Sequence, residues 1–283
     1  MTRGLVFGQG YLGKRISESL NYELAPKFDV LDTRKLEDFL EKNQPEIVIN
    51  AVGKTGGPGA VGIDWCELHK EETLRSNVLA ALNLGIECSK RKIYFVHISS
   101  GCIYQGNNNG RGFSEEDEPN FFGPQYYAKT KIMAEKTLKE LLPGKILQLR
   151  IRMPIDDRPH PRNLIDKLVT YNRVIDVQNS MTSVPDMLLA MKNLIEKRCC
   201  GIYNLTNPGT ISPAKIMQMY KDIVEPSHQF EIMKLEELDR ITLGKRSNCI
   251  LNTEKLKKEG IQMPEIQDAV RKCLLKYKDA LKK

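Results

Sequence analysis

The sequence predicts an α/β protein in which a parallel sheet is covered by helices on both faces. Over the first half of the chain, apolar runs of strand length alternate with helical patterns, and each run is almost continuously apolar. Such runs are typical of strands that are buried on both faces of a parallel sheet. After Met153 and Pro154 a proline-rich loop and then mainly helical patterns follow, which predicts a second, smaller and mainly helical region.

The composition narrows the class of protein. With 283 residues and 41% hydrophobic residues, the chain is long and apolar enough for a large core. The net charge is +7, but the basic residues are spread along the chain, so binding to nucleic acid is not favoured. Seven cysteines without a C-x-x-C pair favour free thiols in a reducing compartment, and no metal site is expected. The sequence contains neither a signal-peptide pattern nor an apolar run of membrane length, which predicts a cytoplasmic protein.

A glycine-rich turn follows the first apolar run directly. Residues 3–7 form that run, Gly8, Gly10 and Gly13 have the spacing G-x-G-x-x-G, and a helical pattern covers residues 12–20. Strand, glycine turn and helix in this order form the dinucleotide-binding fingerprint. The glycines let the backbone approach a pyrophosphate at the helix N-terminus, where free N–H groups and the helix dipole favour anions. The sequence therefore predicts a doubly wound sheet of the Rossmann type that binds a nicotinamide dinucleotide.

The residues that follow this motif favour NADPH over NADH. A carboxylate that binds the ribose diol of NADH is expected about 20 positions after the glycine motif, and Glu23 is the only candidate near the presumed second strand. Lys14 and Arg15 follow the last glycine and could instead pair with a 2′-phosphate.

The other elements follow in chain order. Further strands of the sheet are predicted over 46–51, 92–99, 145–152 and 201–205, and helices between them over 34–43, 70–90, 125–141 and 187–195. Beyond the sheet, helices are predicted over 163–171, 213–220, 233–240, 253–259 and 265–282. We therefore expect a dinucleotide-binding domain over 1–152, completed by about 184–207, and a substrate-binding region over 153–183 and 208–283.

Three residues have the spacing of a carbonyl-reducing site. Ser100 follows the predicted strand 92–99, and Tyr127 and Lys131 are spaced i, i+4, which places their side chains on one face of a helix. A lysine ammonium near a phenol favours the phenolate, so the tyrosine can exchange a proton with a carbonyl oxygen that the serine holds. A Tyr–Lys pair alone is more often an exposed helix surface. The glycine turn upstream supplies the context that favours catalysis.

Together the glycine turn, the small residues Asn50, Ala51 and Gly53, and Ser100 with Tyr127-x-x-x-Lys131 resemble the extended short-chain dehydrogenase/reductase superfamily. Within it, residues 29–32 and 246–256 resemble relatives of dTDP-4-dehydrorhamnose reductase. Strings that resemble the plant-type nucleotide-rhamnose synthase/epimerase-reductase lie at 53–56, 64–70, 101–104, 112–121, 150–155, 161–163, 179–182 and 204–209. One departure is the first glycine loop, which in many members of the superfamily is G-x-x-G-x-x-G.

The resemblance implies a reaction and partners. The plant-type family converts UDP-4-keto-6-deoxy-D-glucose to UDP-β-L-rhamnose with NADPH, by 3,5-epimerisation followed by 4-reduction. A 4,6-dehydratase upstream and a homodimer formed through two helices of each subunit are implied as well. UDP and dTDP sugars both stay open, because both place a pyrimidine and a pyrophosphate in the same groove.

The resemblance also implies residue roles. For reduction, Tyr127 would be the acid, Lys131 would tune it and bind the nicotinamide ribose, and Ser100 would hold the carbonyl oxygen. For epimerisation, Cys102 and Lys167 would be acid/base partners on opposite faces of the sugar, in an order that stays open. On a strand Cys102 would share a face with Ser100, although a cysteine at a strand end is more often a small buried hydrophobe. The role of Lys167 depends on the resemblance alone.

Two sets of binding residues complete the expectation. Those implied for the cofactor are Gly8, Gly10, Tyr11, Leu12, Gly13, Arg15, Asp29, Val30, Asn50, Ala51, Gly53, Asn77, Tyr127 and Lys131. Those implied for the substrate are Thr55, Asp64, Trp65, Cys102, Met153, Asn163, Lys167, Thr182, Arg246 and Asn248. Arg246 is the natural ligand for a pyrophosphate, and Trp65 could either stack on the substrate or brace its own loop.

Two other functions stay open. A monofunctional reductase that acts on an already epimerised sugar would not need Cys102 or Lys167. A non-catalytic dinucleotide-binding regulatory subunit could dispense with the Tyr–Lys pair, which this chain keeps. Exchange of solvent protons at C3 and C5 tests for epimerisation, and oxidation of NADPH tests for catalysis.

Overall fold

The computed structural model describes residues 3–57, 60–123 and 125–282. The chain forms two compact units. Unit 1 comprises Met1–Ser100, Gln125–Arg150 and Leu194–Tyr203, and unit 2 comprises Gly101–Pro124, Ile151–Asn193 and Asn204–Lys283. Residues 101–124, which we expected in the dinucleotide-binding domain, belong to unit 2 because their backbone pairs with residues 248–252 of that unit.

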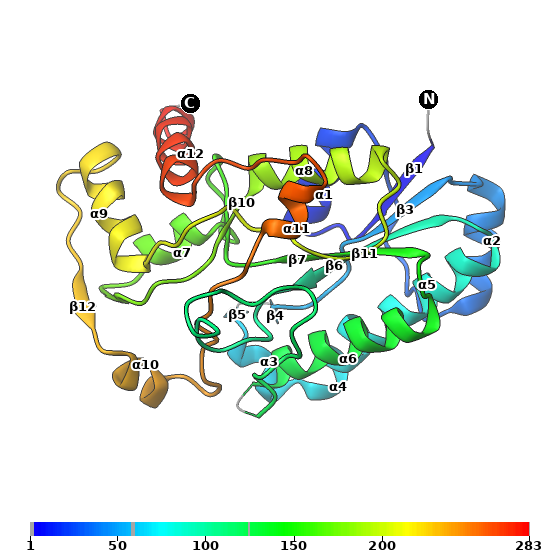
Figure 1. The fold of residues 1–283 in the computed structure, drawn as a ribbon, viewed down its shortest axis with the longest axis horizontal. Helices are drawn as coiled ribbons and strands as arrows, with labels where there is room; N and C mark the ends of the chain where they lie inside the picture. Colours follow the sequence, from blue (N-terminus) through cyan, green and yellow to red (C-terminus); the bar gives the residue numbers. More distant parts are fainter. Residues whose placement is uncertain (1–2, 58–59, 124, 283) are drawn as a thin grey trace. The chain divides into compact units, whose positions relative to one another are not determined.

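A six-stranded sheet is the framework of unit 1, with the strand order β11-β7-β6-β3-β1-β2 (Figure 1). Its strands are β1 (Gly4–Phe7), β2 (Glu23–Leu24), β3 (Ile47–Asn50), β6 (Tyr94–Ser100), β7 (Ile146–Ile151) and β11 (Gly201–Asn204). The pairs β1/β2, β1/β3 and β3/β6 are parallel. All residues of β1, β3 and β7 are buried, which explains their continuous apolar runs. The predicted Rossmann-type parallel sheet is confirmed.

Helices cover both faces of this sheet. The helices of unit 1 are α1 (Tyr11–Leu20), α2 (Thr33–Asn43), α3 (Asp64–Leu68), α4 (Lys70–Leu74), α5 (Ala80–Lys90) and α6 (Tyr126–Leu141). In Figure 1, α2, α5 and α6 lie on one face and α1 on the other. Leu36, Leu84 and Leu138 of α2, α5 and α6 share one core cluster with Leu5 of β1. The apolar stripes of these helices therefore close the core over the buried strands.

The predicted helix 70–90 is one helical run whose winding changes in the middle. Between α4 and α5 lies a π-helix, η1 (Arg75–Leu79). A π-turn adds a residue to the turn and shifts the direction of the side chains that follow, and such turns often occur at functional sites. The short antiparallel pair of β4 (Gly56–Gly57) and β5 (Ala60–Val61) was not predicted, and residues 58–59 lie outside the described residues.

Unit 2 contains two small parallel sheets and most of the remaining helices. The strand pairs are β8 (Pro154–Ile155) with β10 (Thr182–Ser183), and β9 (Arg173–Ile175) with β12 (Glu231–Met233). The helices that follow in the chain are α7 (Leu164–Val169), α8 (Val184–Glu196), α9 (Pro213–Ile223), α10 (Leu235–Ile241), α11 (Glu254–Lys258) and α12 (Ile266–Ala280). Ile165, Met217 and Leu274 of α7, α9 and α12 meet in one core cluster.

Among the described residues, none of the helices combines the length and the hydropathy that a membrane-spanning segment requires.

Candidate active site

The glycine turn between β1 and α1 is shaped by close backbone packing. Gly8 has φ +112°, and a Cβ on it would lie 2.6 Å from the carbonyl of Ala51. A Cβ on Gly13 would lie 1.7 Å from the carbonyl oxygen of Gly8. Packing therefore requires both glycines. Gly10 differs, because a Cβ there would meet nothing within 4 Å, so its small size leaves space that the chain does not fill.

The N-terminus of α1 is suited to an anion. Gly10 is its N-cap residue, without a side-chain cap, and the first turn contains no acidic residue. The first N–H groups and the positive end of the helix dipole are therefore available to a phosphate. Tyr11 and Leu12 are partly exposed at this turn. Of the two basic residues considered for a 2′-phosphate, Arg15 is buried and Lys14 is exposed.

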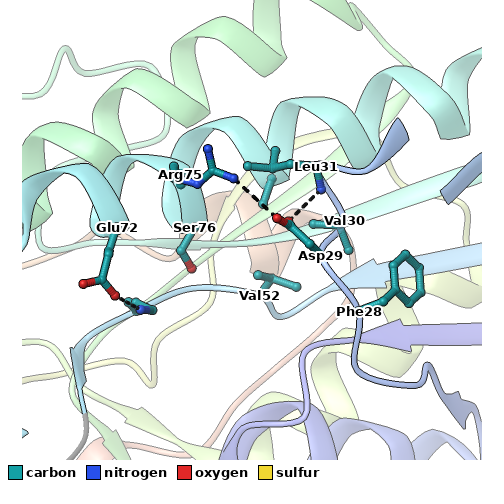
Figure 2. Close-up of a pocket in the computed structure, with 10 residues that line it drawn as sticks. Phe28, Asp29, Val30, Leu31, Val52, Glu72, Arg75 and Ser76 are labelled. Atoms are coloured by element: carbon teal, nitrogen blue, oxygen red, sulfur yellow. Dashed lines mark hydrogen bonds and ion pairs between the residues drawn. The ribbon is translucent and has the colours of Figure 1, made fainter. Parts of the chain in front are cut away.

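A cavity of about 310 Å³ opens in unit 1 beside Asp29 and Val30 (Figure 2). Its apolar wall consists of Phe28, Val30, Leu31, Val52 and Ala80. Two ion pairs lie at its edge, Arg75 with Asp29 at 3.4 Å and Lys54 with Glu72 at 2.6 Å. An apolar slot with a polar edge is suited to a flat heteroaromatic ring. Arg75 and Lys54 were not predicted as site residues, because a single charge on a helix or in a loop gives no signal of a binding site.

Buried amides shape the loop that follows β3. The Asn50 side-chain oxygen Oδ1 accepts from the Val52 N–H at 2.9 Å, and its side-chain nitrogen Nδ2 lies 3.1 Å from Nδ1 of His97. Burial, and then the charge of Lys131, lowers the pKa of His97 well below its usual value, so the imidazole is neutral and Nδ1 can accept from Asn50. Asn50 thus fixes the backbone turn that contains Ala51.

Asn77 holds the same loop from the π-helix. Its Oδ1 accepts from the Lys54 N–H at 2.6 Å, and its Nδ2 donates to the Lys54 carbonyl at 3.1 Å and to the Thr130 hydroxyl at 3.3 Å. Both amide hydrogens are therefore used within the protein. Asn77, predicted as a cofactor ligand, is placed here to position the loop.

Ser100, Tyr127 and Lys131 all lie in unit 1 and are buried. Ser100 ends β6, and Tyr127 and Lys131 lie on the first turns of α6. The Lys131 ammonium donates to the carbonyl of Ile98 at 3.2 Å, which brings it to the carboxyl end of β6. The ammonium lies 6.0 Å from the centre of the Tyr127 ring and 3.7 Å from the position of a Cβ on Gly53. The structure thus brings the predicted Tyr–Lys pair to the ends of β3 and β6.

The expectation for Cys102 needs a correction. Strand β6 ends at Ser100, and Cys102 lies in the turn that follows, so strand alternation does not place the two side chains on one face. A Cβ on Gly101 would lie 2.5 Å from the Leu251 side chain, which explains a glycine at this turn. The partly exposed Cys102 sulfur instead accepts a hydrogen bond from Nη1 of the buried Arg152 at 3.3 Å.

Lys167 lies on α7, the helix that follows a loop whose backbone Asn163 hydrogen-bonds. Asn163 Oδ1 accepts from the N–H groups of Asp156 and Ile165, and its Nδ2 donates to the carbonyls of Asp156 and Arg158. Every hydrogen-bonding position of this fully buried amide is occupied, so it positions the loop and caps α7. Burial, and then the charge of Arg162, lowers the pKa of Lys167 below that of an ordinary lysine. Within the described residues its ammonium forms no hydrogen bond or ion pair.

The other predicted substrate residues fall into buried and accessible groups. Thr182 is fully buried, accepting from the Arg152 N–H and donating to the Leu205 carbonyl. Asn248 is also buried and accepts from the Asn179 amide at 3.0 Å. Those with some exposure are Thr55, Asp64, Met153 and Arg246. Met153 has φ +42°, a conformation that is unusual for a residue before proline.

Trp65 braces its loop. The ring is buried, stacks on His69 at 4.1 Å and lies under the Lys54 ammonium at 4.7 Å. A Cβ on Gly57 would lie 2.2 Å from the indole nitrogen, so the ring and the hairpin pack closely. Of the two possibilities considered for Trp65, the contacts favour the brace. Across the described residues, no group of His, Cys, Asp and Glu side chains is arranged to hold a metal ion.

Comparison with known proteins identifies the family of this chain. The family described as RmlD substrate binding domain matches residues 5–279. The chain belongs to this family. The resemblance to relatives of dTDP-4-dehydrorhamnose reductase, inferred above from scattered strings, is confirmed.

Members of the family with similar sequences occur in a plant and a virus. A bifunctional dTDP-4-dehydrorhamnose 3,5-epimerase/dTDP-4-dehydrorhamnose reductase of Arabidopsis thaliana is 38% identical over 87% of this chain and 80% of its own length. A trifunctional UDP-glucose 4,6-dehydratase/UDP-4-keto-6-deoxy-D-glucose 3,5-epimerase/UDP-4-keto-L-rhamnose-reductase of the same plant is 37% identical over 96% of this chain, which spans only 41% of that protein. The crystal structure of the UDP-rhamnose synthase from Acanthamoeba polyphaga mimivirus matches with a TM-score of 0.91 and 31% identity, covering 97% of this chain and 99% of that one.

Proposed function

We propose that this protein reduces the C4 ketone of a 4-keto-6-deoxy nucleotide sugar with NADPH and also epimerises the sugar at C3 and C5. The observation that carries the proposal is the placement of the Lys131 ammonium beside Tyr127, the Ile98 carbonyl and the Gly53 backbone. This buried cation lies where a parallel sheet of this type binds its ligand, at the carboxyl ends of the strands. The names of the plant relatives include both activities.

The residues of unit 1 fit a dinucleotide. The uncapped N-terminus of α1 and the space beside Gly10 suit a pyrophosphate, and the apolar slot beside Val30 suits the adenine. The two carboxylates that line this slot, Asp29 and Glu72, are each paired with a cation. Neither is free for a ribose diol, which favours NADPH over NADH. When bound, NADPH supplies the hydride for the carbonyl carbon.

The protein's own residues control the proton and the charge in the reduction. Tyr127 gives its phenolic proton to the oxygen that was the C4 carbonyl, and Ser100 donates a hydrogen bond to the same oxygen. Lys131 stabilises the phenolate that forms, because its ammonium is held close to the ring by Ile98. General acid catalysis of this kind contributes about 10²–10⁴-fold.

Epimerisation uses the acidity of protons next to the ketone. Removing the proton at C3 or C5 produces an enolate with its charge on the C4 oxygen, which the same hydrogen-bond donors stabilise. Inversion needs one group that takes the proton and another that returns a proton to the opposite face of the sugar. We assign these roles to Cys102 and Lys167. The lowered pKa of Lys167 makes this lysine more able to exchange a proton near neutral pH than an exposed lysine.

The proposal extends to partners. The substrate is the product of a 4,6-dehydration of a nucleotide sugar, so a 4,6-dehydratase must supply it. The nucleotide can be UDP or dTDP. We also propose a homodimer through the helices of residues 70–90 and 125–141. Leu79, Ile86 and Met133 expose apolar side chains on these helices, which supports this interface.

A paired assay on UDP-4-keto-6-deoxy-D-glucose tests the proposal. The protein is incubated in D₂O with and without NADPH, while NMR follows the sugar and absorbance follows the nicotinamide. Deuterium at C3 and C5 without NADPH, and an L-rhamno product with it, are the expected results. Oxidation of NADPH by a pre-epimerised ketosugar, without deuterium exchange in the first substrate, would identify a monofunctional reductase instead. The absence of both signals would contradict catalysis and favour a dinucleotide-binding subunit.

A further inference from the structure

Arg152 is a buried cation that pairs with no carboxylate in the part of the chain that the structure describes. It follows β7 and is fully buried, and its backbone is fixed by Thr182 through two hydrogen bonds. Its guanidinium donates to the Ser247 hydroxyl at 3.0 Å, to the Ser247 carbonyl at 2.6 Å and to the Asn179 side-chain oxygen. The remaining hydrogen bond goes to Cys102 Sγ at 3.3 Å, and Nε has no partner among the described residues.

This set of partners is unusual for a buried arginine. Burying a charge is costly unless an opposite charge compensates it, and a buried guanidinium usually pairs with a carboxylate. Arg150, two residues earlier on β7, follows that pattern and pairs with Glu135 at 2.7 Å. The amide and the carbonyl that bind Arg152 stay neutral, and the Ser247 hydroxyl already donates to the Tyr104 carbonyl at 2.6 Å. Among the four groups that accept from Arg152, Cys102 is the one that can readily become an anion.

We propose that Arg152 is the positioning residue for Cys102 in the epimerisation step. The inference depends on the proposed function, because it concerns the proton transfer that Cys102 performs there. The Nη1–H group holds the sulfur in a fixed direction, and the guanidinium stabilises the negative charge on sulfur. That charge is present before Cys102 takes a proton from C3 or C5, or after it gives one. The electron pair of the broken C–H bond enters the enolate, and Lys167 completes the exchange on the other face.

Alkylation of Cys102 separates this role from a purely structural one. The thiolate is the form that reacts with iodoacetamide, so loss of the cation should slow the reaction at Cys102. We expect Arg152→Gln to slow labelling of Cys102, quantified by mass spectrometry of its peptide, by about tenfold. Arg152→Lys keeps the positive charge, so its rate of Cys102 labelling should lie between the rates of the wild type and of Arg152→Gln. A structural role predicts the reverse, because loosening the site would expose the sulfur and speed its labelling.

Two controls keep this measurement interpretable. Cys200 is also partly exposed and lies in unit 1, so its labelling in the same sample reports any general unfolding. Arg150→Gln removes another buried guanidinium, two residues earlier on β7, and it should leave the labelling of Cys102 unchanged. Should Arg152→Gln not fold, Ser247→Ala removes one acceptor and donor beside the guanidinium and should alter Cys102 labelling while Cys200 stays constant.

The enzyme assay completes the test. In Arg152→Gln, deuterium exchange at C3 and C5 should fall by about 10- to 100-fold, while reduction of a pre-epimerised ketosugar continues. Unchanged or faster labelling of Cys102 in Arg152→Gln would overturn the proposal. If the wild-type protein shows no exchange but Cys102 labelling still depends on Arg152, the proposed epimerase function fails and the Arg152–Cys102 pairing stands.

Discussion

In unit 1 a regular strand and helix position Ser100, Tyr127 and Lys131, whereas in unit 2 buried polar side chains hold the turn that contains Cys102 and the loop that precedes the helix of Lys167. Ser100 and Lys131 lie at the ends of β6 and on α6, where backbone ladders fix them. Cys102 and Lys167 depend instead on Arg152 and Asn163, whose side chains hydrogen-bond the surrounding loops. The residues proposed for reduction thus belong to a scaffold that backbone hydrogen bonds specify. The residues proposed for epimerisation belong to a region where single polar side chains determine the geometry.

The largest expected effect concerns the reduction residues alone. Tyr127→Phe removes the acid that protonates the C4 oxygen, so the rate of NADPH oxidation should fall by about 10²–10⁴-fold. Deuterium exchange at C3 and C5 should fall much less, because Ser100 can still donate to the enolate oxygen and because Cys102 and Lys167 are intact. Tyr126→Phe, at the neighbouring position of α6, is the matched control and should reduce the ketosugar normally. Equal loss of both activities in Tyr127→Phe would contradict the separation of the two sets of residues.

The next effect tests the side-chain framework of unit 2. Asn163→Ala removes the side chain that hydrogen-bonds the backbone groups of Asp156, Arg158 and Ile165. The free energy of unfolding should fall by about 2–4 kcal/mol, measured by urea denaturation. Asn193→Ala is the control, since that amide only donates to Leu189 on an exposed helix face, and its effect should stay within about 0.5 kcal/mol. Similar losses in both variants would show that the Asn163 network does not hold the loop.

A pair of glycine substitutions sharpens the account of the first turn. In Gly13→Ala the new Cβ would meet the Gly8 carbonyl oxygen at 1.7 Å, and the unfolding free energy should fall by about 1–3 kcal/mol. In Gly10→Ala the Cβ meets nothing within 4 Å, so the stability should be unchanged. The affinity for NADPH should nevertheless fall in Gly10→Ala, as measured by fluorescence titration. If Gly10→Ala binds NADPH as tightly as the wild type does, the pyrophosphate does not bind beside Gly10.

The smallest effect is a pH dependence in unit 1. The folded protein keeps His97 neutral because its pKa is lowered by burial and by Lys131, whereas the unfolded chain binds a proton below about pH 6.5. This difference in proton binding does not affect stability above that pH. Below it, the free energy of unfolding falls by up to about 1.4 kcal/mol for each pH unit. His97→Gln should therefore lose less stability than the wild type between pH 7 and about pH 5.5. Equal losses of stability in His97→Gln and the wild type over this pH range would show that groups other than His97 cause the acid sensitivity.

How much could be read from the sequence differs between the two units. In unit 1 the continuous apolar runs and the glycine spacing predicted the strands, the first turn and the Tyr–Lys pair, because backbone periodicity leaves a pattern. In unit 2 the helices were predicted, but strands of two or three residues have no detectable period. The resemblance implied that Asn163 binds the substrate, but sequence cannot show whether an amide faces a ligand or, as here, the backbone.

Arg152 shows a signal that was present but not used. A second arginine directly after a mainly apolar strand, Ile146 to Ile151 followed by Arg152, cannot be buried without partners. The partners themselves could not be predicted, because Cys102, Asn179 and Ser247 are distant in sequence and join only through tertiary folding. The π-helix at Arg75–Leu79 likewise has no sequence signature, although it positions Asn77 against the loop after β3.

Lys167→Met provides the most direct test of the claim that reduction and epimerisation depend on residues of different units. The variant is incubated with UDP-4-keto-6-deoxy-D-glucose in D₂O, and in parallel with a pre-epimerised 4-ketosugar and NADPH. The account predicts loss of deuterium exchange at C3 or C5 by at least about 100-fold, with reduction of the pre-epimerised sugar retained. Exchange at the wild-type rate, or equal loss of both reactions, would contradict it.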